Sequence, residues 1–539
     1  MTDKFRFRDT DTIGVADAES DSVFLEDCFV DNGLLDLLTD CRDNRRIVVG
    51  RTGAGKTALL NRLKEKHVNA IEISPESLAL AYISNSDILQ FVLRLGVNLD
   101  IFFRLLWRHV FTVEIIKARF DVGSLSGKER IADWIRSQFS AKQKRHEKAL
   151  EYLERWGSTF WEQTDSRVTE VTTKFESELR DSIGAAIPNF KVDMADAEKF
   201  TQEQKAQIVN RATAVVNSVQ IQELSYVLDL LNEVLSDPQR PYYLIIDKLD
   251  ENWVEERVRF LLIRALIETA RDFFKVQNAK IILCLRYDLV DRVVRETRSA
   301  GFQEEKYESL FLDLSWNSDQ LMHLLDARIN KLVRQRYTTQ VVTHRDILPH
   351  TINGQPAMDY IISRTLMRPR DVIMFFNACI RQAGGNPAIS GEMVKTAEGE
   401  YSRSRLRSIA DEWSSEYPKI LRLANVLKEK REAISLGEIT EDECLELTVE
   451  LLAATPKSSE LDSLLRHAEQ TTDFANLRRY IAAAFYRVGL VGLKITPYDP
   501  VVWSTSGRNS ISASEIGPET RLHVHPCFWR SLGIKAHQP

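Results

Sequence analysis

The segment GRTGAGKT, residues 50–57, constrains the fold of this chain more than any other stretch of its sequence. Its three glycines allow backbone N–H groups to wrap around phosphate oxygens, at the start of a helix whose dipole attracts anions. A short β-branched run, RIVV at residues 46–49, precedes the segment, and helical spacing follows it over residues 58–66. Strand, loop and helix in this order are the context that a phosphate-binding loop needs.

Each residue of this loop has an expected role. Lys56 is predicted to reach the β- and γ-phosphates and to assist catalysis there, and Thr57 to offer its hydroxyl to Mg²⁺. The predicted nucleotide contacts in the loop are Gly50, Arg51, Thr52, Gly53, Ala54, Gly55, Lys56 and Thr57. The alternative is a glycine-rich turn without a ligand.

An acidic group at the end of a neighbouring buried strand is the second part that such a site requires. The apolar run YYLII, residues 242–246, leads directly into Asp247, so we predict that Asp247 holds Mg²⁺. Asp250 and Glu251 come next, where a carboxylate can orient the attacking water. We favour Glu251 over Asp250 as the catalytic base; alternatively, both residues cap the helix that follows.

The sequence DKLD, residues 247–250, resembles the second motif of STAND and KAP-type ATPases, in which two aspartates three apart end a strand. The STAND motif usually carries glycine where Lys248 stands here. The resemblance implies that Arg286, at the end of KIILCLR, senses the γ-phosphate; otherwise it is a surface arginine. MRPRDVIMFFN, residues 367–377, is similar to the lid motif of KAP-like and origin-recognition-like ATPases, which implies that Arg370 faces the nucleotide.

The same lid-like segment also has a purely structural interpretation. Pro369 suits the first turn of a helix, and the apolar side chains after it would pack that helix against its neighbours. Taken together, the motifs and their order resemble a bacterial P-loop ATPase family of STAND/KAP-like, AAA-related type that is found near antiphage defence genes. The likeness spans most of the chain. Membership of such a family says little about what hydrolysis accomplishes.

Apolar β-runs at residues 70–73, 242–246, 280–285 and 311–314 alternate with helical patterns, and strand signals are missing from residue 78 to residue 236. The predicted fold class is α/β, a P-loop NTPase parallel sheet with a large helical insertion, a helical lid and a C-terminal winged-helix-like α+β domain. The predicted domains are a flexible N-terminal lead (1–30), the nucleotide-binding core (31–77 and 237–316), the insertion (78–236), the lid (317–418), a helical linker (419–469) and the winged-helix-like domain (470–539).

The chain carries 72 basic and 78 acidic side chains, a net charge of −6, so any binding to nucleic acid must be local. Its six cysteines are scattered, which indicates a reducing cytosol and no zinc site. The N-terminus lacks the apolar core of a secretory signal. Charged residues interrupt the most membrane-like stretch, residues 92–116, which disfavours a membrane-spanning helix. We therefore predict a cytoplasmic protein without a membrane partner.

The region from residue 470 onward carries eight lysines and arginines against four aspartates and glutamates. The basic residues that cluster near its amphipathic helix are Arg478, Arg479, Arg487 and Lys494. Winged helices bind DNA through such surfaces but also dock proteins, so DNA is one candidate partner of this region. Because the nucleotide motifs end near Asn377, we expect the region to be separable from the nucleotide-binding part.

These features favour a regulatory ATPase that acts as a switch. ATP and Mg²⁺ would bind between core and lid and promote self-assembly into a homo-oligomer or release, and hydrolysis would reset the switch. The sequence has no recognisable nuclease, protease or nucleotide-modifying constellation, which implies a separate effector protein, in antiphage defence or stress signalling. Two alternatives are a DNA-binding remodelling or loading ATPase, and a scaffold that binds nucleotide for stability.

Overall fold

The computed structural model divides the chain into two compact units. Unit 1 comprises Met1–Asn32, Arg51–Ala58 and Ser315–Pro539, and unit 2 comprises Gly33–Gly50 and Leu59–Leu314. The residues that the structure describes are 5–78, 80, 85–120, 164–185, 200–218, 231–232, 235, 237–297, 304–334, 340–414, 416–452, 459–504 and 511–535. None of the helices in these ranges is both long enough and apolar enough to cross a membrane.

Unit 2 is built on a five-stranded sheet with the strand order β2-β3-β4-β1-β5, in which every pairing is parallel. Its strands are β1 (Ile47–Val49), β2 (Ala70–Glu72), β3 (Tyr242–Ile246), β4 (Ala279–Leu285) and β5 (Phe311–Asp313). β3 and β4 are buried along their whole length, which explains why both are continuous apolar runs in the sequence. The predicted α/β class, the parallel sheet and the predicted β-runs are confirmed.

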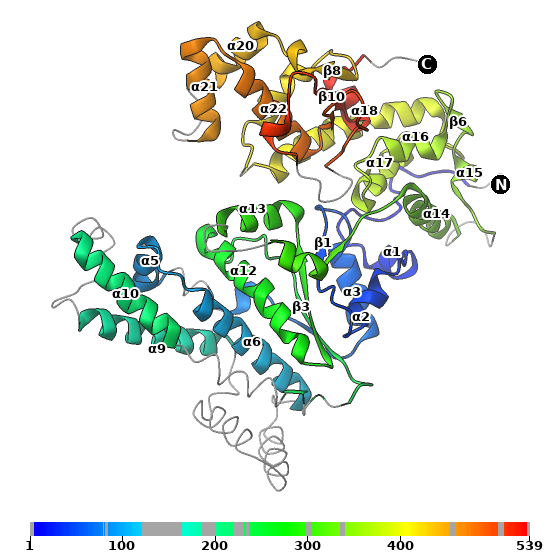
Figure 1. Cartoon of the computed structure of the whole chain (residues 1–539). Helices are drawn as coiled ribbons and strands as arrows, with labels where there is room; N and C mark the ends of the chain where they lie inside the picture. Colours follow the sequence, from blue (N-terminus) through cyan, green and yellow to red (C-terminus); the bar gives the residue numbers. More distant parts are fainter. Residues whose placement is uncertain are drawn as a thin grey trace. The chain divides into compact units, whose positions relative to one another are not determined.

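The connections between the strands place helices on both faces of this sheet. α3 (Lys56–Lys66) connects β1 to β2, whereas α12 (Glu256–Asp272) follows β3 and α13 (Tyr287–Thr297) follows β4. Right-handed crossovers in this strand order put α3 on one face and α12 and α13 on the other, and Figure 1 shows α3 and α12 on opposite sides of β3. The chain therefore leaves the neighbouring strands β1 and β4 toward opposite faces. Such a switch point, at the carboxyl ends of the strands, is where open α/β sheets bind ligands.

Helix α2 (Leu34–Thr39) is fastened to the sheet by polar contacts at its carboxyl end. The ε-amino group of Lys280 on β4 donates to the carbonyl oxygens of Leu37 at 2.7 Å and Asp40 at 2.8 Å. The Tyr243 hydroxyl donates to the Thr39 carbonyl at 2.8 Å. These bonds satisfy carbonyls that have no partner within the helix. Burial of the lysine lowers the pKa of Lys280 to about 8.

Between β2 and β3, the described residues form helices and no strand. The elements are the 3₁₀ helix η1 (Pro75–Leu78) and the helices α5 (Asp87–Arg94), α6 (Asp100–Phe120), α9 (Thr164–Gly184) and α10 (Gln202–Ser218). Trp107 of α6 donates its indole N–H to the Leu262 carbonyl of α12 at 2.9 Å. Phe102 stacks on Phe175 of α9 with ring centroids 4.0 Å apart. The insertion is thus packed onto the face of the sheet that α12 covers. Two short 3₁₀ helices, η4 (Phe273–Lys275) and η6 (Glu304–Leu310), complete unit 2.

The middle of unit 1 is a group of helices that includes the predicted lid. Its elements are α14 (Ser318–Arg334), α15 (His344–Ile347), the hairpin β6 (Thr351–Ile352) and β7 (Gln355–Pro356), α16 (Ala357–Ser363), α17 (Pro369–Gln382) and α18 (Gly391–Glu412). Pro369 occupies the first turn of α17, where its missing N–H costs nothing. Phe375 of α17 stacks on Tyr401 of α18 with ring centroids 4.9 Å apart.

The N-terminal residues differ from the predicted flexible lead. They include α1 (Ser22–Asp27), and the side chains of Phe7 and Ile13 are buried in the core of unit 1. Asp21 forms a buried ion pair with Arg328 of α14 at 2.5 Å. The composition of this segment cannot reveal the ion pair, because the partner of Asp21 lies about 300 residues further along the chain.

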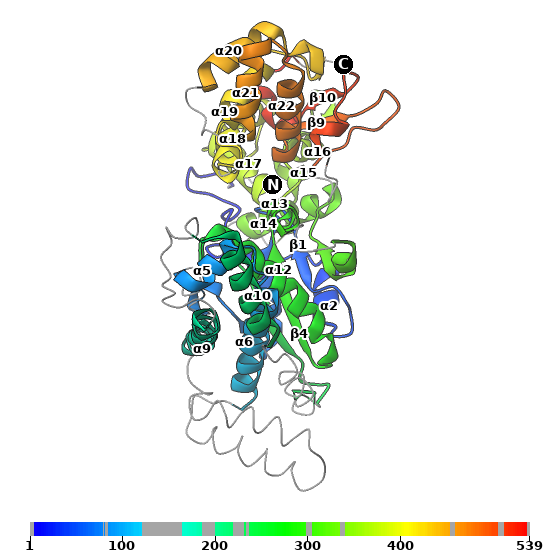
Figure 2. The same ribbon diagram turned by 60° about the vertical axis from the view of Figure 1, so that its left-hand side comes forward.

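The carboxyl end of unit 1 combines helices with a three-stranded antiparallel sheet of order β8-β10-β9. Its strands are β8 (Ala433–Ser435), β9 (Val491–Lys494) and β10 (Arg521–Val524), and its helices are α19 (Ile420–Leu423), α20 (Glu441–Leu452), α21 (Glu460–Thr471), α22 (Ala475–Val488) and α23 (Trp529–Leu532). Its 3₁₀ helices are η7 (Ala424–Leu427), η8 (Leu436–Glu438), η9 (Ala513–Glu515) and η10 (Pro526–Phe528). Figure 2 shows α22 beside β9 and β10. β8 lies in the segment predicted as a helical linker, since a three-residue strand is too short to show a period.

Candidate functional site

The predicted site draws on both units. Residues 51–58 belong to unit 1, whereas Gly50, Asp247, Asp250, Glu251 and Arg286 belong to unit 2. The two predicted Mg²⁺ ligands, Thr57 and Asp247, are therefore in different units.

The glycines of the loop are required by its backbone conformation. Gly53 has φ of +78° and Gly55 has φ of +98°, which side-chain-bearing residues rarely adopt. A Cβ atom on Gly53 would lie 2.8 Å from the Cβ of Arg370 and 2.9 Å from its Cδ. Glycine at position 53 thus lets the loop backbone pack directly on Arg370, so the structure brings the predicted lid arginine onto the loop.

Three successive carbonyl groups of the loop accept hydrogen bonds from residues that lie much later in the sequence of unit 1. Arg368 Nη1 donates to the Thr52 oxygen at 2.7 Å, and Trp316 Nε1 donates to the Ala54 oxygen at 2.7 Å. Between them, the backbone N–H of Arg370 donates to the Gly53 oxygen at 3.4 Å. These bonds hold one side of the loop backbone.

Two further side chains of the loop point to protein acceptors. Lys56 Nζ donates to the Arg51 carbonyl at 3.1 Å. Arg51 Nη2 donates to the Val488 carbonyl, where α22 ends, at 3.3 Å, and burial lowers the pKa of Arg51 to about 10. The side chain of Arg51 is therefore engaged with the end of α22.

Arg368 is held by a buried group of charges on α17 and α18. Arg368 pairs with Asp371 at 2.7 Å, and Arg405 pairs with the same carboxylate at 3.3 Å and with Glu412 at 3.2 Å. Burial alone would raise the pKa of Asp371, but Arg368 and Arg405 outweigh it, and the pKa is lowered. A fully buried carboxylate between two guanidinium groups keeps both arginines in defined rotamers.

At the carboxyl end of β3, the chain turns sharply after Asp247. Lys248 has φ of 58°, in the left-handed region that favours glycine. The STAND motif that this segment resembles usually has glycine at this position, and the structure gives a physical reason: the turn has a positive φ. Lysine adopts the same conformation here at a cost in strain.

Arg286 and Asp250 come together at the same edge of the sheet. The Gly50 N–H donates to the Leu285 carbonyl at 3.2 Å, which places Arg286, the next residue, beside the start of the loop. Arg286 pairs with Asp250 at 3.4 Å and with Asp288 at 2.9 Å. Arg286 is thus a partner of the acidic motif and not an isolated surface arginine.

Asp250 and Glu251 occupy different environments. Asp250 is paired with Arg286, whereas within the described part of the chain the Glu251 carboxylate makes no hydrogen bond or ion pair. Partial burial raises the pKa of Glu251, with a smaller opposite effect of Lys248. Arg259 donates to the Glu251 carbonyl at 2.7 Å and so fixes the backbone of this turn.

The helix-capping alternative for these two carboxylates does not hold. The N-cap of α12 is Glu255, whose side chain accepts hydrogen bonds from the backbone N–H groups of Arg257 and Val258. The acidic pair therefore precedes the cap, which leaves both carboxylates outside the helix.

Arg368 and Trp316 are the site residues that sequence reasoning missed. The signal for Arg368 lies in MRPR, where two arginines flank the proline, but the family resemblance implies a role only for the second, Arg370. Trp316 follows the last strand of the sheet and carries no motif. Only its hydrogen bond to Ala54, 262 residues earlier in the chain, identifies it.

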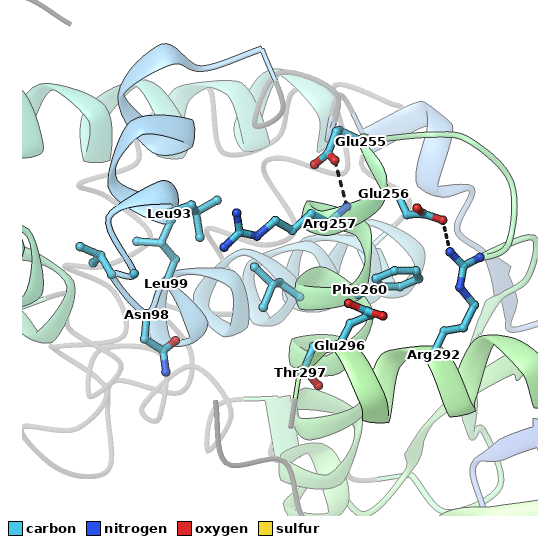
Figure 3. A pocket seen from close by; sticks show the side chains of 13 residues that line it. Leu93, Asn98, Leu99, Glu255, Glu256, Arg257, Phe260, Arg292, Glu296 and Thr297 are labelled. Atoms are coloured by element: carbon cyan, nitrogen blue, oxygen red, sulfur yellow. Dashed lines mark hydrogen bonds and ion pairs between the residues drawn. The ribbon is translucent and has the colours of Figure 1, made fainter. Parts of the chain in front are cut away.

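A cavity of about 660 Å³ in unit 2 lies elsewhere (Figure 3). It is lined by the end of α5, the segment that connects α5 to α6, the start of α12 and the end of α13, with Leu93, Leu99 and Phe260 among its apolar residues. Arg257 extends across it toward Leu93 and Leu99. Glu255, Glu256, Arg292 and Glu296 add charges of both signs. None of the predicted nucleotide-site residues lines this cavity.

Two of the four residues in the predicted basic cluster of the C-terminal region bond to other parts of the protein. Arg478 donates to the Ile439 carbonyl at 2.7 Å, and Arg487 donates to Glu416 at 3.2 Å and to the Tyr417 hydroxyl at 3.4 Å. The part of the predicted DNA-binding cluster formed by Arg478 and Arg487 is thus better explained as internal bracing.

The FunZ-associated C-terminal helical domain matches residues 319–410, the stretch from α14 to α18. A protein of Escherichia coli (strain K12) described as a putative transposon gamma-delta 80.3 kDa protein is 22% identical over 546 residues, which cover 97% of this chain and 67% of that protein. No solved structure matches the chain.

Proposed function

We propose that this protein binds ATP together with Mg²⁺ and hydrolyses it. The observation that carries the proposal is the loop GRTGAGKT, which joins a buried parallel strand to a helix and has positive φ at Gly53 and Gly55. Loops of this composition and context bind the phosphates of nucleotides through backbone N–H groups and the helix N-terminus. The switch point of the sheet, between β1 and β4, gives independent support.

In this proposal each residue has one task. Lys56 binds the β- and γ-phosphates, Thr57 and Asp247 hold Mg²⁺, and Glu251 accepts the proton of the attacking water. The raised pKa of Glu251 and its lack of a described partner support it as the base, while Asp250, paired with Arg286, orients that arginine. Mg²⁺ supplies charge neutralisation between the phosphates when it is bound.

In this proposal the lid contributes Arg370, whose side chain packs on Gly53 and would contact the bound nucleotide. Burial lowers the pKa of Arg370, and the neighbouring Arg368 lowers it further. A bound phosphate group would relieve this accumulation of positive charge. Arg370 therefore supports the triphosphate as the ligand of the site.

Replacement of Lys56 tests this function. We expect Lys56→Ala to abolish tight binding of ATP-Mg²⁺ in calorimetric titration and to stop phosphate release, because it removes the side-chain cation that the loop itself supplies. Lys66→Ala, at the exposed other end of α3, is the matched control and should bind as the parent does. Equal affinity of Lys56→Ala and the parent would overturn the proposal.

For the biological output we propose a regulatory switch that forms a homo-oligomer and acts with a separate effector in bacterial antiphage defence or stress signalling. A second candidate, a DNA-linked remodelling ATPase, is favoured by the name of the Escherichia coli relative, which is described as a transposon protein. Sizing of the purified protein with and without ATP-Mg²⁺, and then with duplex DNA, separates the two. Assembly that depends on nucleotide alone supports the switch, and assembly that requires DNA supports the second candidate.

A further inference from the structure

Two carbonyl groups of the loop accept hydrogen bonds from Arg368 and Trp316, and neither of these residues has a role in the proposed function. The oxygens of Thr52 and Ala54 each accept a 2.7 Å hydrogen bond from a side chain, Arg368 and Trp316 respectively. Side-chain donors that reach backbone carbonyls from 316 and 262 residues away are not a local turn feature. They define the orientation of two peptide planes.

The consequence for the loop follows from the planarity of the peptide bond. In a trans peptide, the carbonyl of one residue and the N–H of the next point in opposite directions. A bond that holds the Thr52 oxygen toward Arg368 therefore turns the N–H of Gly53 away from Arg368. In the same way, the bond from Trp316 to the Ala54 oxygen turns the N–H of Gly55 away from Trp316.

The donors themselves are held in place before any ligand arrives. Arg368 is 2% exposed and is paired with Asp371, which in turn is paired with Arg405. Trp316 is partly buried and packs against the core of unit 1. Both side chains thus lose little further conformational entropy when they bind the loop, so the free-energy cost of ordering the loop is small.

We propose that Arg368 and Trp316 are positioning residues of the phosphate-binding loop: they hold its carbonyls on one side so that the N–H groups of Gly53 and Gly55 are presented to a nucleoside triphosphate. This inference rests on the proposed nucleotide-binding function and adds to it the residues that set the loop conformation. Neither residue needs to touch the ligand.

The sharpest test is Trp316→Phe, which removes one N–H donor and keeps an aromatic ring. Trp413→Phe is the matched control, because within the described residues the buried indole N–H of Trp413 has no hydrogen-bond partner. Titration with ATP-Mg²⁺ should show about fivefold weaker binding for Trp316→Phe, the usual effect of one lost hydrogen bond. Trp413→Phe should bind as the parent does, and melting curves should show that both variants remain folded at the temperature of the titration.

Arg368→Lys gives a second, independent measurement. It keeps a positive charge beside Asp371 but loses the fork that reaches Thr52, so affinity should fall by about tenfold or more. Arg364→Lys is its control, since Arg364 pairs with buried Glu398 at 2.9 Å and makes no described contact with the loop. Affinity equal to that of the controls in both loop variants would overturn the inference.

Hydrogen exchange of the ligand-free protein provides a readout that does not depend on nucleotide. The peptide that contains residues 52–57 should exchange faster in Trp316→Phe than in Trp413→Phe, because its backbone is less restrained. If the parent fails to bind ATP-Mg²⁺, the proposed function is wrong, and exchange still decides the positioning role. Equal exchange in the two variants would then reject it.

Discussion

At the scale of single residues, strain and burial mark positions whose identity matters. Lys248 holds φ of 58° directly after Asp247, and His525, the N-cap of η10, is buried against the rings of Trp503 and Phe528. The first position sets the direction in which the chain leaves β3. The second position, His525, makes the stability of unit 1 depend on pH.

Lys248→Gly should be tolerated, and Lys248→Val should lower the free energy of unfolding by about 1–2 kcal/mol, because a β-branched residue resists positive φ. Urea denaturation of the two variants and the parent measures this. Equal stability of the valine and glycine variants would contradict the assignment of strain to this residue.

The pKa of His525 is lowered to about 3, first by burial and then by the nearby Arg51, against an ordinary value of 6.5. The folded protein therefore keeps His525 neutral while the unfolded chain takes up a proton below pH 6.5. Stability should fall by about 1.4 kcal/mol per pH unit as the pH drops from 6.5 toward 3. The variant His525→Asn, which can still accept the Cys527 N–H, should lose this part of the slope.

The measurement for His525 is urea unfolding at several pH values between 4.5 and 7. His350→Asn, at an exposed histidine, serves as the control for removal of a histidine elsewhere. An unchanged pH slope in His525→Asn would show that the acid sensitivity comes from other groups.

At the scale of elements, α22 is a helix whose basic residues suggest DNA binding but make contacts inside unit 1. Its sequence has the positive charge expected of a DNA-binding helix, yet Arg478 braces the Ile439 carbonyl and Arg487 braces Glu416. The helix is also buried over most of its length, with Leu477, Ile481 and Phe485 in the core. The contacts of α22 therefore stabilise unit 1.

We therefore expect Arg478→Ala and Arg487→Ala each to lower stability by about 1 kcal/mol, the value of a lost hydrogen bond. Arg479→Ala, whose described partner is Asn476 on the same helix, should cost less. Denaturant unfolding gives the order, and a titration with duplex DNA at two salt concentrations gives the contrast. A DNA affinity that drops and loses its salt dependence in Arg478→Ala and Arg487→Ala would restore the DNA-binding interpretation.

At the scale of the whole molecule, residues 51–58 of the glycine-rich loop belong to the same compact unit as helices α14 to α18 and the C-terminal sheet. One hydrophobic core runs through that unit, from Phe5 to Leu532. The region from residue 470 onward therefore contributes to a shared core, and β8 depends on β10 for its pairing.

Removal of residues 470–539 should consequently destabilise unit 1 instead of releasing an independent module. The truncation strips β8 of its partner and uncovers buried residues such as Ile434 and Ile439. We expect faster limited proteolysis of helices α14 to α18 and increased binding of a hydrophobic dye. A truncated protein that unfolds cooperatively at the melting temperature of the parent would support the separable module predicted from sequence.

The sequence by itself determined the local parts of this protein. Glycine spacing predicts a loop that needs positive φ, apolar β-runs predict the strands of the parallel sheet, and a run of buried residues ending in Asp247 marks the acidic edge. Each of these depends on neighbours within a few residues, where steric rules and hydrophobic period act directly.

Only the tertiary structure decided which distant side chains meet. Arg368 reaches Thr52 across 316 residues, β8 joins a sheet whose other strands follow about 60 or more residues later, and Asp21 pairs with Arg328. These contacts leave no period or motif, because either partner alone is an ordinary polar residue. Their geometry depends on the packing of whole helices, which the order of residues in one segment does not specify.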